Sequence, residues 1–237
     1  MAQRRHRLGR VLFRVIVAWL IVTTVPVAVL RFVPVPVSAY MVEQQIAWWR
    51  GGQPHPPLRH RWVPLERISP QLQLAVIASE DQTFRTNWGF DFQAIVAAWR
   101  HDRRHPHQLI GASTITQQTA RNLFLWPGRT WLRKGLEAWF TVLLDLLWPK
   151  ARVLTVYLNS AQFGDGIYGA EAAARFWFHR PSAALDAQQA AQLAAVLPDP
   201  VGMHAGNPSP YVLRRAAEIR VQMRNLGLAY LDFARRH

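Results

Sequence analysis

Two adjacent carboxylates, Glu80 and Asp81, end an apolar stretch and are followed by a segment rich in aromatic residues. Acidic residues are scarce in this chain, which has 14 of them against 28 Lys and Arg. Aromatic neighbours that exclude water from a carboxylate raise its pKa and prepare it for proton transfer. A solvated helix end is the simpler interpretation. An acid at a helix C-terminus nevertheless opposes the helix dipole, and such a local cost often accompanies a function.

A second polar group occupies residues 111–122, with the sequence GASTITQQTARN. Gly111 gives backbone freedom, and Ser113 or Thr114 can cap a helix whose first turn offers N–H groups to an anion. Polar side chains then recur at helical spacing on one face: Thr114, Gln118 and Arg121. An ordinary capped surface helix has the same pattern, so this segment alone does not decide between the two interpretations.

A third group is the sequence RKGLEAW, residues 133–139, in which Arg133 and Glu137 stand four residues apart with Lys134 beside them. A surface ion pair with this spacing contributes only a few tenths of a kcal/mol. The surrounding residues are mostly apolar, and a polar patch on an apolar helix favours a site. Taken together, one carboxylate could deprotonate an attacking hydroxyl while cations stabilise a departing phosphate.

The elements that would position these groups are helices. Capping residues and apolar residues at helical spacing predict eight of them. They cover residues 70–80, 92–103, 113–124, 131–148, 150–160, 168–178, 185–197 and 210–226. Sustained alternation of apolar and polar residues is missing, so the sequence predicts an all-α or almost all-α domain.

The N-terminal segment predicts a membrane anchor. Five arginines and no acids precede residues 15–30, which carry no charge, and residues 11–33 supply the roughly 20 residues that span a bilayer. The basic flank predicts a cytoplasmic N-terminus. The expected organisation is a cytoplasmic tail (1–14), a transmembrane anchor (15–33), a linker (34–58) and a domain outside the cytoplasm (59–237). A cleaved signal peptide is the rival interpretation, because VSA at 37–39 resembles a cleavage site.

The excess of basic residues predicts an anionic binding partner. The net charge is +14, and the chain after residue 40 still has 22 basic residues against 14 acidic ones. An anionic partner is therefore expected, and the predicted topology favours a membrane or a phosphorylated substrate over nucleic acid. The chain has no Cys, which excludes disulfides and thiolate metal sites.

Five ordered motifs within about residues 60–202 resemble the monofunctional peptidoglycan transglycosylases of glycosyltransferase family 51. They are ASEDQTFRTNWGFD, GASTITQQTARNLFL, RKGLEAW, LTVYLNSAQFGDGIYGAEAAARFWF and LDAQQAAQLAAVLPDP. The resemblance implies a mainly α, lysozyme-like glycosyltransferase domain preceded by a single transmembrane helix. It also implies polymerisation of lipid II into β-1,4-linked glycan, with release of undecaprenyl diphosphate, on the periplasmic face of the inner membrane.

The resemblance also implies roles for individual residues. Glu80 corresponds to the general base that deprotonates the incoming 4-hydroxyl group, and Glu137 to a second carboxylate on the pyrophosphate side. Positive charges that would stabilise the leaving pyrophosphate are Arg121, Arg133 and Lys134. Motif positions that would shape the substrate cleft are Asp81, Phe84, Thr114, Gln118 and Asn122. No cofactor is obligatory, but a divalent cation, magnesium or manganese, could bridge Glu137 and substrate.

The sequence departs from the family pattern at four positions. Asn87 replaces a usual His, Arg121 replaces a usual Lys, and Gln162 and Gln189 stand where acids are frequent. Arg121 keeps its charge, whereas Asn87 cannot titrate as the His would. We expect Asn87→His to retain or raise the rate, and a large loss would mean that Asn87 has a role of its own.

Two other functions remain open at this point. A lysozyme-like enzyme that cleaves glycan also needs a carboxylate, but cleavage of a neutral glycan has no use for the three cations. An inactive basic scaffold that binds cell-wall synthesis or division proteins would agree with the four departures. The retention of Glu80 and Glu137 argues against the scaffold.

Overall fold

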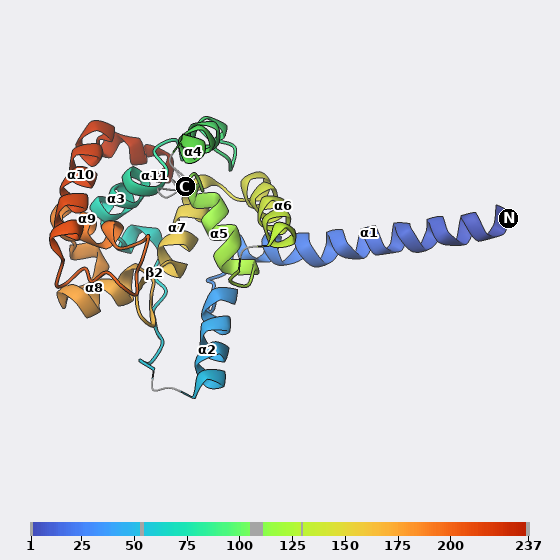
Figure 1. The fold of residues 1–237 in the computed structure, drawn as a ribbon, viewed down its shortest axis with the longest axis horizontal. Coiled ribbons are helices and arrows are strands. Elements are labelled where there is room, and N and C mark those ends of the chain that lie inside the picture. The colour runs from blue at the N-terminus through green and yellow to red at the C-terminus, as the bar shows by residue number, and fades with distance from the viewer. Residues whose placement is uncertain (1, 53–54, 105–110, 129, 236–237) are drawn as a thin grey trace.

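The computed structural model of the 237-residue chain describes residues 2–52, 55–104, 111–128 and 130–235. A long N-terminal helix projects from a mainly helical domain, as Figure 1 shows. The predicted fold class is therefore confirmed. Residue 1 of the expected tail, residues 53–54 of the expected linker, and residues 105–110, 129 and 236–237 of the expected domain lie outside the described ranges.

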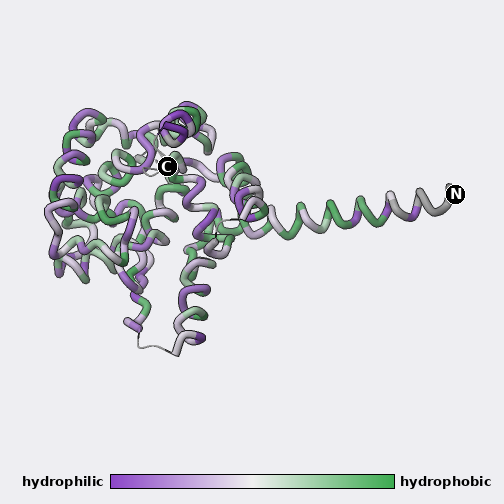
Figure 2. Tube along the Cα trace, in the orientation of Figure 1, coloured by the Kyte–Doolittle hydropathy of each residue, from purple (hydrophilic) through white to green (hydrophobic). Residues whose placement is uncertain are grey.

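The projecting helix is α1, Ala2–Leu30. Its segment Gly9–Leu30 is long and apolar enough to cross a membrane by length and composition, and only 11% of its most apolar window is buried against the domain. Figure 2 shows hydrophobic positions along most of this helix. This helix is compatible with a single-pass anchor.

The C-terminal end of α1 is fixed to the domain by hydrogen bonds to its last carbonyl groups. Trp148 Nε1 donates to the carbonyl oxygen of Val27 at 2.7 Å, and the Arg152 guanidinium donates to that of Leu30 at 2.6 Å. The final carbonyls of a helix have no partner within the helix, so these donors satisfy groups that would otherwise be unpaired. These hydrogen bonds fix the C-terminal end of α1 to the domain.

A second helix, α2, Ala39–Gly51, lies within the segment that was expected to be a linker. Ser38 caps it by accepting a hydrogen bond from the amide of Met41, and Gly52 ends it in the left-handed conformation. Ser38 is a typical N-cap residue and Gly52 a typical C-terminal stop, so the sequence carried the signal for this helix.

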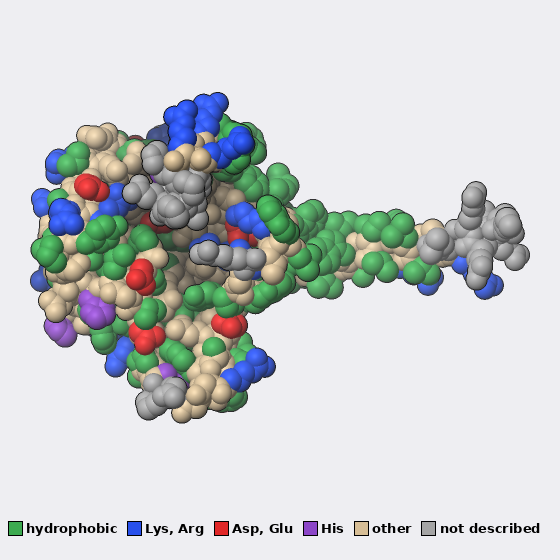
Figure 3. All heavy atoms as spheres, viewed as in Figure 1, with side chains coloured by type: hydrophobic (Ala, Val, Ile, Leu, Met, Phe, Trp, Pro, Cys, Tyr) green, Lys and Arg blue, Asp and Glu red, His purple; other side chains and the backbone are tan. Residues whose placement is uncertain are grey.

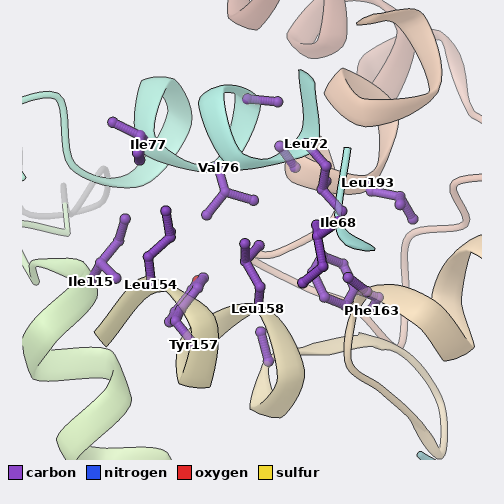
Figure 4. Close-up of a cluster of buried hydrophobic side chains, with 14 of the residues drawn as sticks. Ile68, Leu72, Val76, Ile77, Ile115, Leu154, Tyr157, Leu158, Phe163 and Leu193 are labelled. Atoms are coloured by element: carbon purple, nitrogen blue, oxygen red, sulfur yellow. The ribbon is translucent and has the colours of Figure 1, made fainter. Parts of the chain in front are cut away.

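The core is built around α3, Pro70–Glu80, which packs against α9, Ala187–Ala195, and α10, Pro210–Leu226. Seven consecutive residues of α3 are buried, as expected for a central helix that is apolar all round. Figure 4 shows α3 side chains meeting those of α7, Lys150–Ser160. Glu80 therefore stands at the end of a helix that is buried along most of its length.

Two more helices carry the other candidate residues. They are α5, Ile115–Phe124, and α6, Trp131–Leu147, which pack against each other, and α5 also packs against α7. Exposed apolar side chains on α6 include Trp131 at 93% and Leu146 at 71%. In Figure 3 hydrophobic side chains continue from α1 onto the adjoining part of the domain.

The remaining elements complete the domain. The helices are α4, Phe92–Arg104; α8, Ala170–Phe178; and α11, Asp232–Arg235; the 3-10 turns are Leu65–Arg67, Ser182–Ala184 and Leu228–Leu231. A small sheet has the order β1-β3-β2, with β1 (Arg59–His60) parallel and β2 (Gln162–Gly164) antiparallel to β3 (Ile167–Tyr168). Strands of two or three residues are too short to produce a visible alternation. The helix expected to be last, α10, is followed by α11.

Candidate active site

Glu80 is the last residue of α3, and its carboxylate is held by a chain of side-chain hydrogen bonds. Gln118 Nε2, from α5, donates to Glu80 Oε2 at 2.8 Å. The Tyr157 hydroxyl, from α7, donates to Gln118 Oε1 at 3.1 Å, which fixes the orientation of the Gln118 amide. Figure 4 shows Tyr157 rising from α7 among the core side chains. Three helices thus determine the position of one carboxylate.

The environment of Glu80 raises its pKa. Burial is the largest cause, because it penalises the charged form. Hydrogen bonds from Gln118 and Ser79 and the positive charges of Arg215 and Arg121 act in the opposite direction without cancelling the effect of burial. A carboxylate with a raised pKa is a stronger base, so this residue is suited to remove a proton from a hydroxyl group.

Asp81 is also buried, but its carboxylate is engaged within the protein. Oδ2 accepts a hydrogen bond from the Ile115 amide at 3.1 Å, and both oxygens accept from Asn87 Nδ2, at 2.9 and 3.1 Å. Thr83 Oγ1 donates to Oδ1 at 3.1 Å. Asp81 therefore joins the end of α3 to the start of α5. We expect it to position Glu80 and Gln118 rather than to bind substrate.

Thr114 caps α5 and ties it to the loop after Glu80. Its hydroxyl accepts from the Gln117 amide at 3.2 Å and donates to the Gly89 carbonyl oxygen at 2.6 Å. Gly89 has φ +79°, and a Cβ there would come within 3.0 Å of Thr141 on α6. The amides of Ile115 and Gln117 are both used inside the protein. The expectation that the first turn of α5 offers free N–H groups to an anion is therefore wrong for these two.

Asn87 connects two charged groups. Its Nδ2 donates to Asp81, and its Oδ1 accepts from Lys150 Nζ at 3.0 Å. Lys150 in turn forms an ion pair with Asp145 at 2.8 Å. An amide performs both functions at once because it has a donor and an acceptor end. Asn87 thus links Asp81 to Lys150, a structural role that the sequence comparison with the family did not predict.

Phe84 lies in the interior and holds the loop in place. Its side chain is fully buried, its ring contacts Phe233 edge-on at 5.8 Å, and Lys150 Nζ lies 5.2 Å from its centroid. The Tyr230 hydroxyl also accepts from the Arg85 amide at 3.0 Å. In this conformation Phe84 contacts protein, so its contribution to the cleft is indirect.

Two cavities adjoin the Glu80–Gln118 pair. The first, of about 220 Å³, is lined by residues of several elements: Tyr40, Gln118, Arg121, Asn122, Tyr157, Ser160, Ala161, Gln162, Leu197, Pro198 and Pro200. The second, of about 190 Å³, is lined by Glu80 itself together with Asp81, Asp91, Thr114 and neighbouring residues. Gln118 lines the first cavity and donates to Glu80 in the second, so the two cavities meet at this hydrogen bond.

The third predicted group forms a compact ion cluster on α6. Arg133 NH1 lies 3.1 Å from Glu137 Oε2, and Lys134 Nζ lies 2.5 Å from Glu137 Oε1. The Glu137 side chain is 1% exposed and that of Arg133 10%, so this is not the surface ion pair that spacing alone would suggest. None of the three residues lines either cavity, although α6 packs on the helix that carries Gln118.

The cluster does not by itself make a metal site. Both oxygens of Glu137 are engaged by cationic side chains. Within the part of the chain that the structure describes, no group of three His, Cys, Asp or Glu residues could hold a metal ion. A cation beside Glu137 would have to displace Lys134 and take most of its ligands from elsewhere.

Sequence reasoning did not identify several residues of this region. Tyr157 orients Gln118, Arg215 acts on Glu80 through its charge, and Tyr40 from α2 lines the first cavity. Tyr157 lies in one of the quoted motifs, so a signal existed for it. Arg215 lies outside all five motifs, and only the folded chain brings it here. Tyr40 lies in RFVPVPVSAYMVEQQ, residues 31–45, a segment after the anchor that also resembles the monofunctional family members.

The two glutamines that depart from the family pattern have different surroundings. Gln162 lines the first cavity, and its Nε2 donates to the Gly164 carbonyl oxygen at 3.0 Å. Gln189 completes the capping box of α9 with Asp186 and accepts from Arg180 NH1 at 3.3 Å. Gln189 is thus a helix-capping residue.

A buried carboxylate whose pKa is raised, next to a cavity that Arg121 lines, is the arrangement expected of an acid–base enzyme with an anionic substrate. The chain matches the family described as Transglycosylase over residues 51–224. It is 53% identical over 214 residues to a biosynthetic peptidoglycan transglycosylase of Pseudomonas putida strain KT2440, covering 89% of this chain and 90% of that protein. A Salmonella heidelberg protein of the same name is 51% identical over 220 residues, covering 93% and 91%. The chain belongs to the transglycosylase family.

Proposed function

We propose that the protein is a peptidoglycan glycosyltransferase that polymerises lipid II into β-1,4-linked glycan strands and releases undecaprenyl diphosphate. The observation that supports this most directly is the Glu80 carboxylate, buried and held by Gln118 next to a cavity lined by Arg121 and Asn122. Membership of the transglycosylase family supports the substrate class.

In the proposed reaction Glu80 acts as the general base. The 4-hydroxyl group of the acceptor sugar gives its proton to the Glu80 carboxylate while its oxygen bonds to the anomeric carbon of the donor chain. The bond from that carbon to the pyrophosphate oxygen breaks, and the electron pair leaves with undecaprenyl diphosphate. Attack from the opposite side inverts the anomeric centre. Gln118 keeps the base aimed at the hydroxyl, and Tyr157 fixes Gln118.

Positive side chains are proposed to stabilise the charge that develops on the leaving group. Arg121 lines the first cavity directly. Arg133 and Lys134 together carry one more positive charge than Glu137 neutralises, and Arg133 Nε is buried without a hydrogen-bond partner among the described residues. A buried, incompletely paired guanidinium is suited to phosphate oxygens.

The proposed cellular location rests on α1. We propose that Gly9–Leu30 crosses the cell inner membrane once, with the arginine-rich N-terminus in the cytoplasm and the catalytic domain in the periplasm. A substrate carried on a polyprenyl chain then reaches the site without leaving the bilayer. The exposed apolar side chains of α6 near the end of α1 agree with this arrangement.

The test is incubation of the full-length protein with fluorescently labelled lipid II in detergent and in liposomes, across a range of divalent ions. Glycan polymer is the expected product. Shortening of preformed glycan strands without polymer formation would favour the hydrolase. A folded protein that neither extends nor shortens glycan would refute the proposal and favour the scaffold.

A further inference from the structure

The outward face of α2 is an apolar stripe. Val42, Ile46 and Trp49 are 47%, 38% and 79% exposed, and their spacing of four and three residues places them on one side of the helix. Arg50 is exposed next to this stripe. An exposed tryptophan within a continuous apolar row is costly in water and indicates a covered surface.

The opposite face of α2 packs on the domain and fixes the rotation of the helix. Met41 is buried, and Tyr168 of β3 donates a hydrogen bond to Gln44. Trp48 lies over the turn that joins β2 and β3, where a Cβ at Gly166 would be 3.2 Å from its ring. The direction of the stripe is therefore set by the fold.

The stripe faces the side on which α1 extends. Figure 1 shows α2 running crosswise to α1 at the domain end of that helix, with β2 on the other side of α2. Gln44 and Trp48 point toward the small sheet, so the stripe points away from it. The short connection between the two helices has two more exposed apolar side chains, Phe32 at 78% and Val37 at 51%.

We infer that α2 is an interfacial helix, which lies on the outer surface of the bilayer that α1 crosses and inserts its apolar stripe at the boundary of headgroups and acyl chains. An exposed apolar row that includes a tryptophan, with a basic residue at its edge, is suited to this position. The inference rests on the proposed membrane anchor and extends it. The anchor would hold the protein in the membrane, and α2 would set the height and tilt of the domain.

This contact bears on catalysis because α2 also reaches the site. Tyr40, in its first turn, lines the cavity together with Gln118 and Arg121, and α2 packs against α5. A bilayer surface under α2 places that cavity at the level of lipid phosphates. A lipid-borne pyrophosphate would then meet Arg121 without leaving the interface.

The experiment uses the full chain, whose lack of Cys allows clean single-cysteine labelling. An environment-sensitive fluorophore is placed at Ile46→Cys, and the protein is reconstituted in nanodiscs of phosphatidylethanolamine and phosphatidylglycerol. Ala47→Cys is the matched control, because Ala47 is exposed on the same helix about 100° away from Ile46. Glu218→Cys, on α10, serves as the aqueous reference, and Val22→Cys reports insertion of α1.

The expected result for the label at position 46 is quenching by doxyl lipids and several-fold weaker quenching by iodide than at positions 47 and 218. Iodide quenching at 46 as strong as at 218, with position 22 protected, would overturn this inference and leave the anchor intact. Protection of 46 from both quenchers would also overturn it, because a protein partner or a second copy would then cover the stripe. An aqueous label at position 22 would refute the anchor itself, and with it the interfacial helix.

Discussion

Replacing Asn87 with leucine removes an amide that joins two charged groups and keeps the number and branching of the side-chain heavy atoms. The bonds lost are those from Asn87 Nδ2 to the two Asp81 oxygens and from Lys150 Nζ to Asn87 Oδ1. Asp81 retains Thr83 and the Ile115 amide as donors. The Asp81 carboxylate therefore loses one of its three donor groups and keeps the other two.

The size of the effect depends on how easily water replaces each bond. The Lys150 side chain is 20% exposed, so water can take the place of the lost acceptor. Asp81 is only 6% exposed, so its lost bond is replaced poorly. A hydrogen bond to a charged group contributes roughly 1.5–3 kcal/mol, so we expect Asn87→Leu to lower the free energy of unfolding by about 2–3 kcal/mol. For a chain of this size that corresponds to a fall in melting temperature of about 4–12 °C.

The assay combines thermal unfolding in detergent with the rate of glycan polymerisation measured well below the transition. Asn87→His is the matched variant, since a neutral imidazole can donate to Asp81 and accept from Lys150. It should keep or raise the rate at neutral pH and lose activity at acid pH, where the imidazolium has no acceptor for Lys150. An Asn87→Leu protein with unchanged melting temperature and full activity would refute this account of the network.

Two further predictions concern the carboxylates. The hydrogen bond from Gln118 acts to lower the pKa of Glu80, so Gln118→Leu should raise that pKa further. The acid limb of the pH–rate profile should then move to higher pH. An acid limb that stays in place or moves to lower pH would contradict this prediction. Glu137→Gln leaves the buried Arg133 without its carboxylate and should destabilise the protein by roughly 3–5 kcal/mol in urea unfolding. Glu218→Gln, at an exposed pair, should change stability by less than about 1 kcal/mol, and equal losses at 137 and 218 would argue against burial as the cause.

The helices were predictable because their signals are local. Ser69 and Ser209 accept hydrogen bonds at the starts of α3 and α10, and Asp91 does so at the start of α4, as the sequence indicates. Capping and periodicity depend only on residues a few positions apart. The small sheet was not predictable in this way, because it pairs strands of two or three residues from distant parts of the chain.

The site residues also differ in whether a local sequence signal or only the folded chain reveals them. Glu80 and Gln118 were candidates from the sequence, but their local patterns fitted an ordinary helix end and an ordinary capped helix equally well, and the resemblance to the family selected them. Tyr157 and Arg215 act on Glu80 only because the fold places α7 and α10 beside it. The structural roles of Asp81 and Asn87 also depend on burial and on partners that the sequence does not specify.

The central claim, that Glu80 is the base, is tested most directly by Glu80→Gln. The amide cannot accept the proton, so the polymerisation rate should fall by about 10²- to 10⁴-fold. Burial raises the pKa of Glu80 in the folded protein. At neutral pH, which is above the pKa of this group in the unfolded chain, keeping Glu80 ionised therefore costs folding free energy. The variant should therefore be at least as stable as the parent, which separates lost chemistry from lost folding. A stable Glu80→Gln protein that polymerises lipid II at a rate close to the parent would contradict the account.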